Sequence, residues 1–80
     1  MALNTTQITV LHWFYTCYAK GEAANYKGTI EHFGSVLRIS EPMDVIKSLL
    51  EMGLVSINKT KLEVSITKEG IKLYESLKKK

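Results

Sequence analysis

The lysines in the second half of the chain are the residues whose type and spacing most directly suggest a chemistry. Residues 54–80 carry seven lysines against three glutamates, a net charge of +4, whereas residues 1–53 have a net charge of −1. Lys59 and Lys61 lie in a short polar stretch between two apolar segments. Clustered ammonium groups attract phosphate, which favours contact with a nucleic acid. The alternative is that these lysines only hydrate a small surface.

The other reactive side chains do not form a catalytic or metal-binding pattern. The chain has one cysteine, Cys17, and two histidines, His12 and His32. A single cysteine excludes an internal disulfide, and the set lacks the ligand spacing of a zinc site. No nucleophile is paired with a base, and no glycine-rich loop could cradle a phosphate. We therefore expect no enzyme activity, no metal and no cofactor.

Length and composition predict one globular domain over residues 1–80. Hydrophobic residues make up 45% of the chain and charged residues 24%, an ordinary globular balance. The longest apolar run is far shorter than the roughly 20 residues that span a bilayer. Residues 1–10 also lack the charged start and apolar core of a secretory signal. These features predict a cytoplasmic protein without a membrane segment.

A first helix is predicted near the start of the chain. Asn4, Thr5 and Thr6 offer capping oxygens, and Gly21 can end the helix. Its predicted core-facing side comprises Ile8, Leu11, Phe14, Tyr15 and Tyr18. Further apolar side chains lie off this stripe and exceed what an 80-residue core can cover. Because symmetric dimers are the commonest soluble oligomers, we expect a homodimer formed by this helix and the last one. The predicted interface residues of the first helix are Val10, Trp13, Phe14 and Cys17.

The middle of the chain predicts a short strand and a second helix. Residues 25–27 are candidates for a strand that pairs with a later hairpin. Thr29 is then expected to cap a short helix whose apolar residues are Ile30, Phe33, Val36 and Leu37. A tight turn follows, with Ile39 pointing inward. It connects this helix to the next in a helix-turn-helix arrangement.

A third helix is predicted from the spacing of apolar residues before Gly53. Ser40 is its expected cap, and Glu41 and Pro42 suit the first turn, where an anion and a missing amide are tolerated. Gly53 is expected to end the helix in a left-handed conformation. The predicted buried face comprises Met43, Ile46, Leu49 and Leu50.

The apolar period then changes to two, which predicts a β-hairpin. Val55 and Ile57 alternate with polar residues before the stretch 58–61. A second alternating set contains Leu62, Val64 and Ile66. Thr67 ends this strand and can cap a last helix from Lys68. The apolar residues of that helix are Ile71, Leu73, Tyr74 and Leu77.

Three segments resemble the winged helix-turn-helix family, especially small MarR-like regulators and their archaeal and viral relatives. TIEHFGSVLRIS (residues 29–40) resembles the second helix and turn, and DVIKSLLEMGLV (44–55) resembles the recognition helix. SITKEGIKLYESL (65–77) resembles the strand that leads into the last helix. The resemblance implies an α+β fold with a three-helix core, a β-hairpin wing and a C-terminal helix.

The resemblance also implies a function. Residues 41–52 would enter the major groove of double-stranded DNA while the wing contacts phosphate, and a homodimer would act as a small transcriptional regulator. Carried over to this chain, the groove-facing residues are Glu41, Asp44, Val45, Lys47 and Ser48. The wing residues are Asn58, Lys59, Thr60 and Lys61, and Lys68 would add a phosphate contact.

The third helix departs from the family's usual chemistry because its exposed side is rich in acids. Glu41, Asp44 and Glu51 outnumber Lys47 there, whereas DNA-reading helices generally present basic or amide side chains. Carboxylates can still accept a hydrogen bond from cytosine. The alternative function is a winged-helix protein-interaction module that binds a basic partner without contacting DNA.

Overall fold

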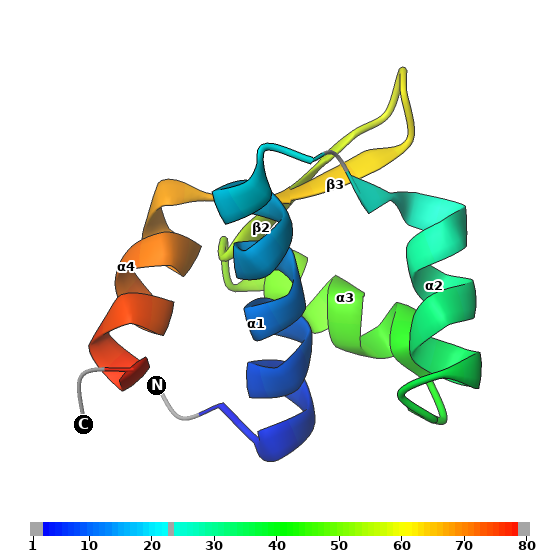
Figure 1. Cartoon of the computed structure of the whole chain (residues 1–80), viewed down its shortest axis with the longest axis horizontal. Coiled ribbons are helices and arrows are strands. Elements are labelled where there is room, and N and C mark those ends of the chain that lie inside the picture. Colours follow the sequence, from blue (N-terminus) through cyan, green and yellow to red (C-terminus); the bar gives the residue numbers. More distant parts are fainter. Residues whose placement is uncertain (1–2, 23, 79–80) are drawn as a thin grey trace.

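Helices pack around a small sheet in the computed structural model, which describes residues 3–22 and 24–78 (Figure 1). In chain order the elements are α1 (Thr5–Lys20), β1 (Ala24–Asn25), α2 (Tyr26–Ser35), α3 (Pro42–Glu51), β2 (Val55–Asn58), β3 (Glu63–Ile66) and α4 (Lys68–Lys78). The described residues thus form an α+β domain with four helices and a three-stranded antiparallel sheet. This class of fold is the one that the sequence predicts.

α1 begins and ends where its sequence predicts. The Asn4 side chain accepts a hydrogen bond from the Gln7 amide, and the Gln7 side chain accepts one from the Asn4 amide, so the first turn is capped reciprocally. Gly21 ends the helix with φ 72°, a left-handed conformation that glycine adopts without strain.

The sheet has the strand order β1-β3-β2, so β3 lies in the middle. β2 and β3 form the predicted hairpin, with Val55 opposite Ile66 and Asn58 opposite Glu63. The short strand predicted at residues 25–27 does pair with the hairpin, but it comprises Ala24–Asn25. Residues 26–27 already belong to α2.

The caps of α2 and α3 differ from the sequence prediction. Asn25, not Thr29, caps α2 by accepting a hydrogen bond from the Gly28 amide at 3.0 Å. Thr29 is consequently inside the helix and buried, and its hydroxyl has no hydrogen-bond partner among the described residues. Glu41, not Ser40, is the N-cap of α3, because Pro42 at the first helical position keeps the preceding residue out of the helical conformation.

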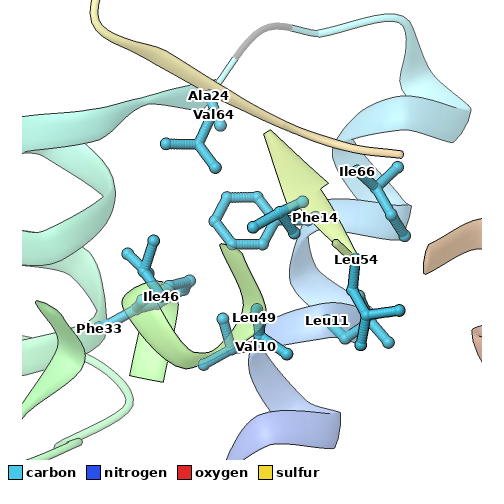
Figure 2. Packing of buried hydrophobic residues seen from close by; sticks show 11 residues of the cluster. Val10, Leu11, Phe14, Ala24, Phe33, Ile46, Leu49, Leu54, Val64 and Ile66 are labelled. Carbon is cyan, nitrogen blue, oxygen red and sulfur yellow. The ribbon is translucent and has the colours of Figure 1, made fainter. Parts of the chain in front are cut away.

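The core lies between α1, α2, α3 and the inner face of the sheet (Figure 2). Its buried hydrophobic residues are Val10, Leu11, Phe14, Ala24, Phe33, Ile46, Leu49, Leu54, Val55, Val64 and Ile66. Several residues predicted to be buried are instead exposed, namely Tyr18, Val36, Leu37, Met43 and Leu62. α2 ends at Ser35, so the two residues after it leave the helical stripe. Leu50 is only half-buried, because the core-facing side of α3 is centred on Ile46 and Leu49.

The connection from α3 into the hairpin also anchors α4. Gly53 has φ 76°, and the amides of Gly53 and Leu54 donate to the carbonyls of Leu50 and Leu49, which closes α3 in a Schellman motif. The Thr67 hydroxyl donates to the Gly53 carbonyl at 2.6 Å and accepts from the Gly70 amide at 3.1 Å. Thr67 therefore caps α4, as predicted, and ties it to the end of α3.

Candidate nucleic-acid interface

The hairpin tip presents the lysines that the sequence singles out. It projects beyond the ends of the neighbouring helices (Figure 1). The Asn58 carboxamide oxygen accepts hydrogen bonds from the amides of Thr60 and Lys61, at 3.0 and 3.2 Å, and so shapes the turn. Lys59, Thr60 and Lys61 are all exposed. An ordered turn therefore carries two exposed ammonium groups. The Asn58 oxygen already accepts two hydrogen bonds from the backbone of this turn.

Lys68 does not belong to the tip. It begins α4 at the far end of β3, and at about 3.4 Å per residue that strand places it more than roughly 10 Å from the turn. Lys68 therefore lies apart from Lys59 and Lys61, and the phosphate contact expected of it stays a prediction.

α3 exposes only part of its predicted groove-facing set. Glu41, Asp44 and Lys47 are exposed. Val45 and Ser48 are half-buried, and Ser48 lies against α1, where its hydroxyl accepts a hydrogen bond from the Gln7 side-chain amide at 3.0 Å. The same hydroxyl donates to the Val45 carbonyl at 2.7 Å. Val45 and Ser48 are thus turned at least partly away from solvent. Any contact between α3 and DNA bases would therefore come from Glu41, Asp44 and Lys47.

The exposed side of α3 is negative in the structure, as the sequence suggests. Glu51 joins Glu41 and Asp44 among its exposed residues, against Lys47 as the exposed cation. Asp44 lies in the first turn, where a carboxylate stabilises the positive end of the helix dipole. A role in helix stability therefore accounts for Asp44. Glu51 is the last residue of α3, where the helix dipole does not favour a carboxylate, so helix stability does not explain its presence.

A surface hollow of about 480 Å³ lies beside the start of α3. Its walls come from the start of α1, the connection between α2 and α3, and the first turn of α3. Thr6, Thr9, Arg38, Glu41 and Asp44 are among the polar residues that line it. Two predicted groove-facing acids thus border a concave surface, which sequence periodicity alone does not reveal.

Two of the four predicted dimer residues of α1 lie in the core, and the other two are half-buried. Val10 is 0% exposed and Phe14 1% exposed, so both belong to the core and cannot offer contact area to a second chain. Trp13 is half-buried and packs edge-to-face on Phe14 and Phe33, with ring centroids 5.4 and 5.2 Å apart. α2 thus covers part of the apolar surface of Trp13, through Phe33.

Cys17 is half-buried on α1. Burial raises the pKa of its thiol above the usual value, the Glu22 carboxylate raises it further, and Lys20 lowers it by a smaller amount. The neutral thiol is consequently favoured near pH 7, which disfavours a nucleophilic role.

α4 packs on α1 through aromatic and polar side chains. The rings of Tyr15 and Tyr74 lie 4.5 Å apart, and the Tyr15 hydroxyl donates to a Glu75 carboxylate oxygen at 3.1 Å. That hydrogen bond is the main reason why the pKa of Tyr15 is raised. His12 Nδ1 is also hydrogen-bonded to the Tyr74 hydroxyl. The apolar residues of α4 nevertheless remain only half-buried: Ile71, Leu73, Tyr74 and Leu77.

Comparisons with known proteins leave the site without an assigned ligand. No protein-family model, curated protein or solved structure significantly matches the chain. Over residues 3–22 and 24–78, no three His, Cys, Asp or Glu residues gather as a metal site would require. In the same part of the chain, no helix has both the length and the apolar character needed to cross a membrane.

Proposed function

We propose that this chain is a winged helix-turn-helix domain of a small regulator that binds double-stranded DNA. Two helices separated by the six residues 36–41, followed directly by a hairpin, give the order that the family resemblance implies. The central position of β3 between β1 and β2 also supports this proposal. In this reading α3 is the recognition helix and the β2–β3 hairpin is the wing.

The observation that carries the proposal is the pair of exposed lysines on the projecting hairpin tip. Each ammonium group can neutralise a phosphate and release condensed counterions, which is the main source of affinity for DNA. Lys47 can donate to guanine, and Glu41 or Asp44 can accept from cytosine. The lysines thus supply affinity that does not depend on sequence, and α3 supplies the sequence readout.

The double substitution Lys59→Glu, Lys61→Glu tests the phosphate contacts. It is expected to weaken binding to a mixed-sequence duplex and to lower the slope of log affinity against log salt by about 2, roughly 1 per lost contact. The measurement is fluorescence anisotropy at several salt concentrations. Lys72→Glu, Lys78→Glu is the matched control, because it changes the net charge equally on exposed residues of α4. If both double variants lose the same affinity for the duplex, net charge alone explains the effect, and this result would contradict the proposal.

A second candidate function is a protein-interaction module, favoured by the acidic exposed side of α3. A helix that presents Glu41, Asp44 and Glu51 suits a basic partner better than a phosphate backbone. The same titration separates the two functions. If the unmodified protein shows no salt-dependent binding to duplex DNA, the protein-interaction function replaces the regulator.

We also propose that the protein forms a homodimer through the surface shared by α1 and α4. The half-buried apolar residues of α4 support this, since a partner would complete their burial. Leu77→Glu should leave a monomer with normal helix content, whereas Trp13→Glu would damage the packing on Phe33. Sedimentation at roughly tens of micromolar is the measurement. A monomer before substitution would contradict the dimer.

A further inference from the structure

Leu62 occupies an unusual position at the hairpin tip. Its φ is 53°, in the left-handed region that glycine and asparagine adopt readily and that a bulky side chain rarely adopts. The side chain is also 54% exposed, although its place in the alternating pattern predicts burial. More than half of this apolar residue is thus open to solvent, on a turn that is otherwise polar. Such outliers concentrate at functional sites.

Hydrogen bonds on both sides hold Leu62 in this conformation. Its carbonyl accepts from the Tyr26 amide at 2.7 Å, which ties it to the start of α2. On the preceding side, Asn58 fixes the turn through the amides of Thr60 and Lys61. The backbone at Leu62 is therefore fixed, next to two exposed lysines. A turn that is already ordered loses less conformational entropy when it binds.

We propose that Leu62 is an apolar wedge that enters the minor groove of duplex DNA and opens a base step, while Lys59 and Lys61 neutralise the flanking phosphates. This inference rests on the proposed DNA-binding function and specifies how the tip engages its target. Positive charge beside the leucine matches the DNA backbone, and apolar side chains inserted between base pairs are an established way to kink a duplex. The ligand of the hairpin tip is thus a DNA duplex whose minor groove can be deformed.

The wedge carries a sequence preference of its own. Opening a step costs least at flexible pyrimidine–purine steps such as TA and most in stiff A-tracts. The tip should therefore favour a duplex that contains a TA step where the hairpin lands. This preference requires no hydrogen bond from the tip to a base and would act in addition to readout by α3.

The test uses a short duplex with 2-aminopurine in place of the adenine of one TA step, and a matched duplex in which an A-tract replaces that step. The protein is expected to raise 2-aminopurine fluorescence by unstacking the base. Leu62→Gly and Leu62→Asn should abolish this rise and weaken binding to the TA duplex about tenfold, with the salt slope unchanged because both lysines remain. Both variants should withstand urea at least as well as the unmodified chain, since they relieve the left-handed strain.

The controls distinguish the wedge from a fold defect and from the proposed function. Val36→Ala removes another exposed apolar side chain, after α2, and should leave fluorescence and affinity unchanged. Salt-dependent binding without a fluorescence rise, or with a rise that survives Leu62→Gly, would overturn the wedge while the DNA-binding function stands. The wedge would also be overturned if Leu62 were needed for binding to anionic lipid vesicles but not to DNA. No duplex binding at all would overturn both proposals.

Discussion

Replacing Gly70 by alanine is expected to destabilise the domain by about 3 kcal/mol, although alanine is the better helix former. Gly70 is buried in the first turn of α4. A Cβ added there would lie 2.1 Å from the Leu54 carbonyl oxygen and 2.7 Å from Ile66 Cγ1. The Leu54 carbonyl cannot move aside freely, because it accepts a hydrogen bond from the Thr67 amide at 3.0 Å. α4 would have to shift away from the sheet, and its contacts with α1 would weaken.

Gly34→Ala is the matched control for this prediction. Gly34 lies in α2, it is exposed, and nothing lies within 4 Å of an added Cβ. That substitution should stabilise the domain by about 0.5–1 kcal/mol through helix propensity alone. Urea denaturation followed by circular dichroism measures both changes. If Gly70→Ala proves as stable as Gly34→Ala, α4 does not depend on this close backbone approach.

Leu49→Ala is expected to cost about 2–5 kcal/mol, a large share of the roughly 5–15 kcal/mol that holds a small domain together. Leu49 is 0% exposed and lies among the residues contributed by α1, α2 and the sheet (Figure 2). Removing its side chain would lose apolar burial and leave a cavity that the surrounding helices can fill only partly.

Leu50→Ala provides the comparison, because it removes the same atoms from the next residue. Leu50 is half-buried, so its loss should be clearly smaller. The difference between the two denaturation midpoints is the quantity to measure. Equal losses, or a larger one for Leu50, would instead support the buried face that the spacing of apolar residues predicts.

Local signals predicted much of this fold because their physical causes are local. The side chains of Asn4 and Thr67 cap helices by accepting hydrogen bonds from amides three residues later. Gly53 ends α3 by adopting a left-handed conformation that few other residues tolerate. The two-residue period located the hairpin. The prediction for the α2 cap failed because Asn25 competes with Thr29, and both residue types can cap a helix.

The candidate site was predicted less completely, because exposure depends on which elements meet. The family resemblance placed Val45 and Ser48 among the groove-facing residues of α3, but both are half-buried and Ser48 is hydrogen-bonded to Gln7 of α1. It placed Val10 and Phe14 at a dimer surface, but both side chains are buried within this domain. Leu62 fits an alternating strand in the sequence, and only the path of the four-residue turn moves it to the exposed tip.

The sequence by itself determined the class of the fold, the order of its elements and the presence of basic residues between two strands. These features follow from periodicity, capping and turn chemistry, which act over a few residues. The tertiary structure decided which apolar side chains form the core and that Gly70 must remain without a side chain. Those outcomes depend on contacts between residues far apart in the sequence, which no local pattern specifies.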